Sequence, residues 1–299
     1  MALKKLQMDA DNPVFDEEIS ADEQADISAM FGAKQESEAV NQEKTTEIPI
    51  ENIIPSKHNK FEPYKGEKKQ ATVAANLGYI LSQNNLVGIL STNMVYGSIQ
   101  HLFGTVIDDC HGLYEMSLSK YDTAKTFVPC LNNKNLFLMS LANSHDCLML
   151  ADEENGINGE RAKEILSELK EMFQYLIVDC EPEINNPLSV YSIIYADKII
   201  NLIKPTITGT AFFNSYRSLY SALEIPDNKI IHVANNDKNY VGIKNVEKTV
   251  GLKMFLTIPH YKNVEQTENK GQLACFTKNG YFYDIRKIAD RIKESASDE

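Results

Sequence analysis

Large apolar residues are rare in the first 46 residues and regularly spaced in the rest of the chain. Residues 1–46 are rich in Asp, Glu, Gln, Ser and Ala. Such a segment buries too little apolar surface to offset the entropy lost on ordering. We therefore expect a disordered acidic tail and tether over residues 1–60, followed by one folded domain over residues 61–299.

From about residue 72 onward, apolar runs alternate with amphipathic stretches. The expected strands are LVGIL (86–90), LFLMSLA (136–142), YLIVDC (175–180), DKIINLIK (197–204), KIIHVANN (229–236) and LKMFLTIP (252–259). Helices are expected over 72–82, 160–173, 209–223 and 283–294, where apolar residues have helical spacing. This alternation predicts βαβ units with right-handed crossovers. The expected fold is α/β, with a doubly wound, mostly parallel sheet and helices on both faces.

Two stretches within the first 66 residues depart from the polar background. In ADISAMFGAK, Ile27, Met30 and Phe31 fall on one helical face, which fits either a fluctuating turn or a short helix that docks on a partner. The stretch IPIENIIPSKHNKFEP is extended and interrupted by proline, which indicates a tether or an edge strand.

Composition and charge argue against several classes of function. The formal net charge is −12, and the first 60 residues hold 13 acidic against 6 basic side chains, so direct nucleic-acid binding is not expected. Five widely spaced cysteines fit reduced thiols rather than a zinc site. The chain start lacks the apolar core of a signal peptide. No apolar run approaches the roughly 18 residues that span a bilayer. We expect a cytoplasmic protein without a direct membrane anchor.

Ligands of doubly wound sheets bind at the carboxyl ends of the strands, so the residues that follow each strand are the informative ones. Asp179 ends the apolar run YLIVD. A carboxylate in this position can orient magnesium in nucleotide-hydrolysing proteins. Alternatively, it caps the turn that follows the strand. Cys180, the next residue, is expected to be an ordinary buried thiol.

The order and spacing of these segments over residues 62–294 resemble the ParA/MinD superfamily of deviant Walker-A ATPases, a group of SIMIBI-type P-loop proteins. The closer resemblance is to the CpaE/TadZ-like branch, which helps place pilus or secretion machinery at the cell pole. The matching segments are KGEKKQATVAANLGYIL, GILSTNMVYGSIQHLFG, YLIVDCEPEINNPLSVYSIIYADKIINLIKP, HVANND and GIKNVEKTVGLKMFLTIPHYKNVEQTENKGQLACF. They are similar, in that order, to the phosphate loop with its helix, the Asp-x-Asp loop, the Walker-B region, the adenine-contacting strand and the closing pattern.

The resemblance places the phosphate-binding loop at residues 65–72. Lys65 corresponds to the signature lysine that reaches the nucleotide of the partner subunit, and Gly66 corresponds to the first loop glycine. Gln70 replaces the Walker lysine, and Ala71 replaces the Thr or Ser that binds magnesium. Only Thr72 is retained. A hydrogen bond without charge assistance has about half the strength, so Gln70 is a poor substitute.

Four further positions bear on whether the site can bind phosphate and magnesium. Glu67 and Lys69 replace loop glycines, which allow backbone N–H groups to converge on phosphate. Ser91 and Asn93 replace the two aspartates of Asp-x-Asp. Asp179 is therefore a candidate Walker-B carboxylate and magnesium ligand that has lost its partners.

The remaining matches concern packing and the nucleotide base. Asn235 corresponds to the residue that contacts adenine, and it also suits a turn. Asn76 and Gly78 lie on the helix after the loop and are expected to serve packing. Gly97 is expected in a turn. The final helix carries Ile285, Ile288 and Ile292 on one side, and its acidic end indicates that it packs on the sheet rather than on lipid.

The strand expected before the loop is not obvious. NKFEPY precedes it, and both proline and glutamate are unsuited to a central strand. Either the first strand is short and damaged, or IPIENII supplies it with an insertion between.

The resemblance implies a ParA/MinD-like protein that binds ATP or ADP with Mg²⁺ weakly or not at all and hydrolyses ATP very slowly or not at all. It would be a spatial or assembly factor for a secretion, conjugation or pilus system such as the Tad pilus. It would form a homodimer, and its protein partners would recruit it to the inner membrane face or the cell pole. Two alternatives stay open. One is an active ATPase in partition or polar localisation, for which Lys65 and Asp179 would be critical. The other is an adaptor of an intact partition ATPase.

Overall fold

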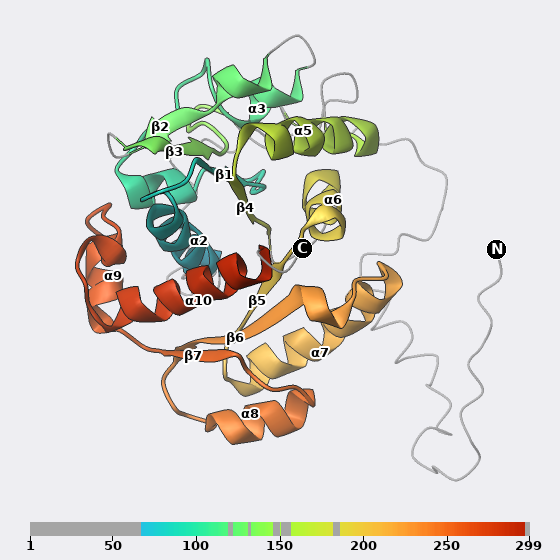
Figure 1. The fold of residues 1–299 in the computed structure, drawn as a ribbon, viewed down its shortest axis with the longest axis vertical. Coiled ribbons are helices and arrows are strands. Elements are labelled where there is room, and N and C mark those ends of the chain that lie inside the picture. Colours follow the sequence, from blue (N-terminus) through green and yellow to red (C-terminus); the bar gives the residue numbers. More distant parts are fainter. Residues whose placement is uncertain are drawn as a thin grey trace, which may run out of the picture. The chain divides into compact units, whose positions relative to one another are not determined.

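The computed structural model describes residues 67–118, 122–130, 133–145, 150, 157–181 and 186–296 (Figure 1). The tail and tether expected over residues 1–60, together with Lys65 and Gly66, lie outside the described residues. None of the helices within the described ranges combines the length and hydropathy that crossing a membrane requires.

The described strands form two sheets, with the orders β2-β3-β1-β4 and β5-β6-β7. They are β1 Val87–Ser91, β2 Val128–Cys130, β3 Asn133–Met139, β4 Tyr175–Asp179, β5 Ile199–Ile203, β6 Ile230–Asp237 and β7 Leu256–Pro259. Among the described strands, all neighbouring pairs run parallel except β2 and β3, which are antiparallel. In the first sheet, β1 is central and fully buried.

Helices connect the strands as expected for βαβ units. They are α2 Glu67–Leu81, α3 Leu113–Ser117, α5 Gly159–Met172, α6 Pro187–Tyr195, α7 Ile207–Ala222, α8 Ile243–Val250, α9 Lys262–Glu268 and α10 Gly280–Ala296. The shorter turns are η2 Ile99–Phe103, η3 Thr123–Thr126, η4 Asp227–Lys229 and η5 Ala274–Phe276. Asn158, Asn186 and Thr206 begin α5, α6 and α7, and each side chain accepts a hydrogen bond from a first-turn N–H.

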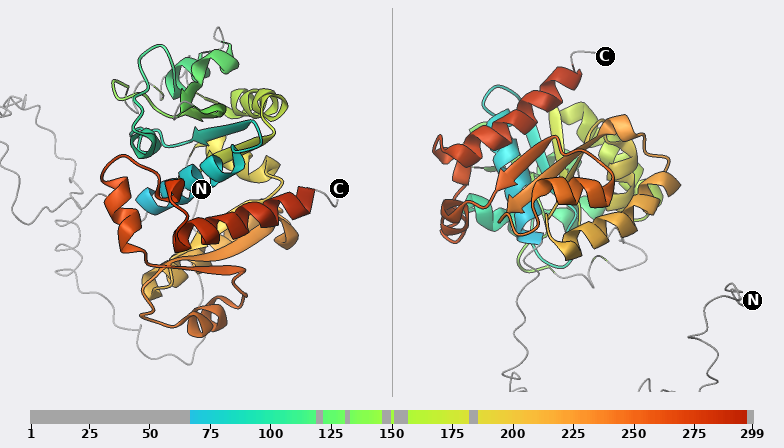
Figure 2. Two further views of the ribbon diagram at one scale, coloured as in Figure 1. Left: turned by 60° about the vertical axis from the view of Figure 1, so that its left-hand side comes forward. Right: turned by 90° about the horizontal axis from the view of Figure 1, so that it is seen from below.

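Three apolar clusters hold these layers together. The largest includes side chains of α2 and α10 and one face of both sheets, from Ile89 in β1 to Ile258 in β7. On the opposite side, α3, α5 and α6 pack on the first sheet, whereas α7 and α8 pack on the second (Figures 1 and 2). The predicted α/β fold, with mostly parallel strands and helices on both faces, is therefore confirmed. The expected single sheet is divided in two among the described strands.

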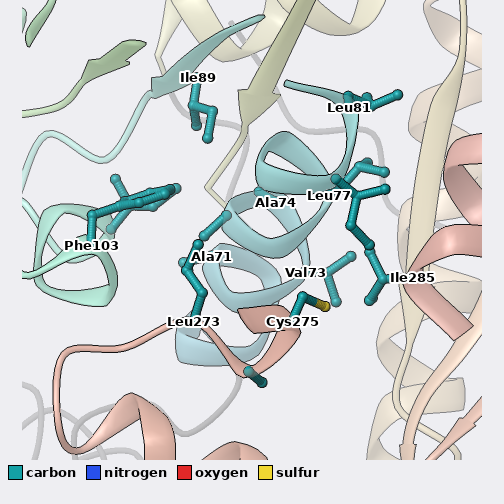
Figure 3. Close-up of a cluster of buried hydrophobic side chains, with 14 of the residues drawn as sticks. Ala71, Val73, Ala74, Leu77, Leu81, Ile89, Phe103, Leu273, Cys275 and Ile285 are labelled. Carbon is teal, nitrogen blue, oxygen red and sulfur yellow. The ribbon is translucent and has the colours of Figure 1, made fainter. Parts of the chain in front are cut away.

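Helix α2 is the most enclosed helix of the domain. From Ala71 to Ser82, every residue except Tyr79 is buried, and Figure 3 shows its side chains between Ile89 on one side and Ile285 of α10 on the other. A Cβ atom at Gly78 would lie 2.5 Å from Cδ1 of Ile89, so glycine is needed for this close approach.

Asn76 has a packing role on the same helix. Its Nδ2 donates to the carbonyl oxygen of Thr72 at 2.8 Å, and its Oδ1 accepts from the N–H of Cys275 at 2.9 Å. The expected structural roles of Asn76 and Gly78 are confirmed. Ile285 and Ile288 of α10 are fully buried in the same cluster, with Ile292 partly buried, which confirms that the final helix packs in the core.

The start of α2 differs from the prediction. The sequence predicts a loop up to Ala71 and a helix from Thr72, but the helix begins at Glu67. Residues 67–70 are Glu, Lys, Lys and Gln, all of which favour helix, whereas glycines would oppose it. The same substitutions that remove the glycines therefore extend the helix backward into the loop positions.

Candidate functional site

A small hollow lies at the carboxyl ends of the strands of the second sheet. It is lined by Thr72, Asn235, Ile258, Pro259, His260, Tyr261, Val264, Glu265, Glu268 and Tyr281. Its volume is about 30 Å³, which holds one or two water molecules. Two of the predicted nucleotide-contacting residues, Thr72 and Asn235, thus meet at one place, although they are far apart in the sequence.

The chain's own carboxylate contacts Thr72 in this hollow. The Thr72 hydroxyl donates a hydrogen bond to Oε1 of Glu268, the last residue of α9. Glu265, one turn earlier, also lines the hollow, and no lysine or arginine is among the described residues around it. An incoming polyphosphate would therefore meet the acidic side chains of Glu265 and Glu268 in this hollow.

Two tyrosines complete the wall and stay protonated. The Tyr261 hydroxyl donates to Oδ2 of Asp284 at 2.9 Å, and burial together with this bond raises the pKa of Tyr261 to about 12. Burial, followed by the nearby Cys275, Glu268 and Asp284, raises the pKa of Tyr281 well above its ordinary value. Two neutral phenols and two glutamates are thus among the groups that line the hollow.

Among the residues that correspond to the phosphate loop, the described ones, 67–72, are helical. Glu67 to Gln70 make the first turn of α2, and Ala71 and Thr72 are buried in its second turn. From residue 71 onward, each backbone N–H of a helix that begins at residue 67 is directed at a carbonyl four residues earlier. These N–H groups cannot converge on a phosphate. The N–H groups of residues 67–70, in the first turn, have no carbonyl partner within the helix.

The second predicted motif lies at the ends of β1 and β4. The strands pair in register, so Ser91 is directly opposite Asp179. The Ser91 hydroxyl is fully buried and has no hydrogen-bond partner within the described part of the chain. Oδ1 of Asn93 accepts from the N–H groups of Val95 and Tyr96, at 2.9 and 3.1 Å. Asn93 therefore shapes the turn after β1, as asparagine commonly does.

Hydrogen bonds tie the loops after β1 and β4 together. The N–H of Thr92 donates to the carbonyl oxygen of Asp179 at 3.0 Å, and its hydroxyl lies 2.7 Å from that of Ser189. Oε1 of Glu181 accepts from the N–H of Met94 at 3.1 Å, and Oε2 accepts from Nδ2 of Asn186 at 3.3 Å. A carboxylate two residues beyond Asp179 thus holds these two loops together.

Asp179 lies half-buried at the end of β4 and does not line the hollow that contains Thr72 and Asn235. Within the described ranges, no group of three or more His, Cys, Asp or Glu side chains could hold a metal ion. The assignment of Asp179 as a magnesium ligand therefore stays a prediction. Burial, then the charges of Asp179 and Glu181, raises the pKa of Cys180 to about 12, as expected for a buried thiol.

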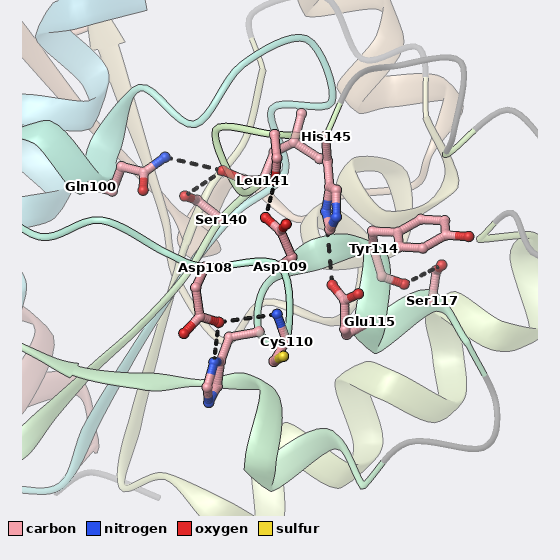
Figure 4. A network of polar contacts seen from close by, with 12 residues as sticks. Gln100, Asp108, Asp109, Cys110, Tyr114, Glu115, Ser117, Ser140, Leu141 and His145 are labelled. Carbon is pink, nitrogen blue, oxygen red and sulfur yellow. Dashed lines mark hydrogen bonds and ion pairs between the residues drawn. The ribbon is translucent and has the colours of Figure 1, made fainter.

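A polar network on the other side of β1 also has a structural role (Figure 4). Nε2 of Gln100 donates to the carbonyl oxygen of Leu141 at 3.1 Å, and its Oε1 accepts from the N–H of Ile107 at 2.8 Å. A Cβ atom at Gly97 would lie 2.1 Å from the same carbonyl oxygen, which explains the glycine. In the same region, Nδ1 of His145 lies 3.8 Å from Oε2 of Glu115.

No protein-family model and no curated protein matches this sequence. Solved structures do match it. A ParA family ATPase from Chlorobium tepidum is 18% identical, with 75% of this chain and 94% of that chain covered and a TM-score of 0.64. The cell division protein MinD from Aquifex aeolicus is 14% identical, with 76% and 92% covered and a TM-score of 0.61.

A putative plasmid partition protein from Borrelia burgdorferi, bound to AMPPNP, is 16% identical, with 77% and 95% covered and a TM-score of 0.61. The chain therefore has the fold of the MinD and ParA ATPases. At this level of identity, the comparison establishes the fold and leaves the activity open.

The sequence could not reveal the part that α9 has in the site. Glu268 lies 196 residues from Thr72, and only the folded chain brings them together. In the sequence, only the similarity of TIPHYKNVEQTE to the closing pattern of the ParA/MinD superfamily indicated this segment. That similarity did not single out Glu265 or Glu268.

Proposed function

We propose that this chain is a member of the ParA/MinD superfamily that has lost ATP hydrolysis and works as a spatial or assembly factor. In this proposal, it presents a protein surface, as a dimer, to the components of a secretion, conjugation or pilus system. Those partners recruit it to the inner membrane face or the cell pole.

One observation carries the proposal: the place of the phosphate loop is taken by the first turns of α2, with Thr72 bonded to Glu268. Phosphoryl transfer depends on positioning and on charge stabilisation by a lysine and by magnesium. Here the loop positions are helical, Gln70 has replaced the lysine, and Glu268 brings a negative charge to the retained threonine. Loss of turnover follows from all three changes.

Exposed apolar residues favour a role in protein binding. Val95, Ile207 and Tyr240 follow β1, β5 and β6, and between 66% and 80% of each is exposed. The carboxyl ends of parallel strands lie at one edge of a sheet. These side chains therefore offer exposed apolar contact area beyond the carboxyl ends of their strands. The related Aquifex aeolicus MinD is found in a MinC:MinD cell division protein complex, which also supports this role.

Calorimetry of the full chain with Mg-ATP tests the loss of nucleotide binding. We expect no heat at millimolar ATP, whereas the Borrelia burgdorferi partition protein, which binds AMPPNP, provides a positive control. A dissociation constant below about 100 µM, or roughly −5.5 kcal/mol, would mean that the altered loop still holds phosphate, and turnover would then be measured. ATP turnover that is abolished in Asp179→Ala would instead establish an active ATPase.

Partner binding should not depend on nucleotide. Proteins captured by the full chain are expected to be the same, in identity and amount, with Mg-ATP, with Mg-ADP and without nucleotide. The Asp179→Ala variant should capture the same set. Capture of an intact partition ATPase as the main partner would favour the adaptor alternative.

A further inference from the structure

One face of α2 is held along most of its length by a segment that lies far away in the sequence. Thr72, Asn76 and Tyr79 have the spacing i, i+4 and i+7, so they lie on one face of this helix. Each of them contacts residues 262–276, which comprise α9, the turn after it and η5 (Figure 1). We call residues 262–276 the strap.

Two of these contacts are ordinary packing. Oδ1 of Asn76 accepts a hydrogen bond from the N–H of Cys275 at 2.9 Å. The rings of Tyr79 and Phe276 meet edge to face, with their centroids 5.1 Å apart. Figure 3 shows Leu273 and Cys275 against α2, inside the largest apolar cluster. These contacts fix the position of the strap along the helix.

Both ends of α9 are also held independently of α2. Just before α9, the Tyr261 hydroxyl donates to Oδ2 of Asp284 in α10 at 2.9 Å. After it, Gly271 has a φ of +64°, and a Cβ atom there would lie 3.0 Å from the carbonyl oxygen of His101 in η2. Glycine permits both this left-handed conformation and the close backbone approach. The surrounding fold therefore places α9, and with it Glu268.

The contact between Thr72 and Glu268 is of a different kind, because packing alone does not require a charge. Glu268 is half-buried, and it accepts the hydrogen bond of the buried Thr72 hydroxyl. A hydrogen bond to a carboxylate is about twice as strong as one between neutral groups. Because Cα–Cβ bonds tilt toward the start of a helix, Thr72 directs its hydroxyl toward the first turn of α2. The N–H groups of that turn carry a partial positive charge, which favours an anion beside them.

We propose that Glu268 is an internal substitute for an external anion at Thr72, so that the strap closes over α2 without a nucleotide. This inference rests on the proposed loss of nucleotide binding, and it names the group that takes the place of the nucleotide. Because Glu268 belongs to the same chain, its effective concentration at Thr72 is about millimolar or higher. The domain then keeps one conformation whether or not nucleotide is present, as nucleotide-independent partner binding requires.

Rescue by an added anion tests the proposal in the full chain. In Glu268→Ala, the melting temperature should fall by about 3–8 °C, because the buried Thr72 hydroxyl loses a charged acceptor. Inorganic phosphate at about 50 mM should restore at least half of this loss, beyond the general stabilisation that phosphate gives the unmodified chain. Adding Thr72→Val to Glu268→Ala should abolish the rescue, because the hydroxyl that binds the anion is gone.

Glu265→Ala is the matched control. It removes another carboxylate of α9 that lines the same hollow, but Glu265 is exposed. Its melting temperature should change by less than about 2 °C, because exposed charges contribute little to stability. Phosphate should stabilise this variant no more than the unmodified chain.

Two results would overturn the proposal. One is a Glu268→Ala variant that melts at the same temperature as the unmodified chain. The other is an effect of phosphate on Glu268→Ala that is no larger than on the unmodified chain, or that persists without the Thr72 hydroxyl. If Glu268→Ala does not fold, Glu268→Gln decides. It keeps the size and an acceptor oxygen without the charge, so its melting temperature should fall by about half as much, and no fall would refute the role of the charge.

Failure of this inference can be told apart from failure of the proposed function. Calorimetry of the unmodified chain with Mg-ATP reports on nucleotide binding alone. The rescue of Glu268→Ala by phosphate reports on Glu268 alone, because it involves no nucleotide.

Discussion

The contact between α2 and β1 at Gly78 allows a quantitative test of the packing that positions the site. In Gly78→Ala, the new methyl group would lie 2.5 Å from Cδ1 and 3.0 Å from Cγ1 of Ile89. Ile89 is fully buried in the cluster shared by α2, α10 and both sheets. The side chain of Ile89 must therefore move, or α2 must shift away from the sheet.

The change in the free energy of unfolding can be estimated for each single variant. Overpacking of a core destabilises a protein by about 1–3 kcal/mol, and alanine recovers about 1 kcal/mol of helix propensity relative to glycine. We expect Gly78→Ala to lower the free energy of unfolding by about 1 kcal/mol. Ile89→Val removes Cδ1 and should cost about 1 kcal/mol by itself.

The double variant should be more stable than the sum of these changes predicts. In Gly78→Ala/Ile89→Val, the alanine methyl group occupies space that the isoleucine Cδ1 has left. We expect a favourable coupling of about 1–2 kcal/mol, measured by urea unfolding of the four proteins. The control pairs Gly78→Ala with Ile165→Val, which is buried in the cluster on the opposite face.

Additivity in the Gly78 and Ile89 cycle, within about 0.5 kcal/mol, would refute the reasoning. It would mean that the helix relaxes away from β1 rather than conflicting with the Ile89 side chain. Coupling of the same size in the Ile165 control would also count against it, because those two residues belong to different clusters.

Three further predictions concern other buried groups. Asn76→Ala should lower the free energy of unfolding by about 1–3 kcal/mol, because the buried N–H of Cys275 loses its acceptor. Cys110 is exposed, whereas burial raises the pKa of the Cys275 thiol to about 12. Iodoacetamide at neutral pH should therefore label Cys110 and leave Cys275 unmodified in the folded chain, as measured by mass spectrometry. Burial raises the pKa of Glu115, beside His145, above its ordinary 4.5, so the folded state holds this proton more tightly than the unfolded state. Stability should therefore fall as pH rises from 4.5 through the raised pKa, and Glu115→Gln should remove that fall in thermal melts; an unchanged pH profile would contradict it.

Apolar periodicity was sufficient to locate most elements of the domain. The run YLIVD became β4, IINLI became β5, and the spacing of Ile285 and Ile288 correctly placed the final helix in the core. These predictions succeeded because burial of a strand or a helix face is a local constraint on residue type. The short edge strand β2 has no such pattern, and its pairing with β3 could not be predicted.

The sequence by itself determined that the nucleotide motifs are altered, because the residue types at positions 67, 69, 70, 71, 91 and 93 can be read directly. It also determined the α/β class. Only the tertiary structure decided what replaces the loop: α2 begins at Glu67, and Glu268 contacts Thr72. Helix propensity is local, but helix starts depend on what the first turn packs against. The contact depends on two segments 196 residues apart, whose meeting is set by the packing of the whole sheet.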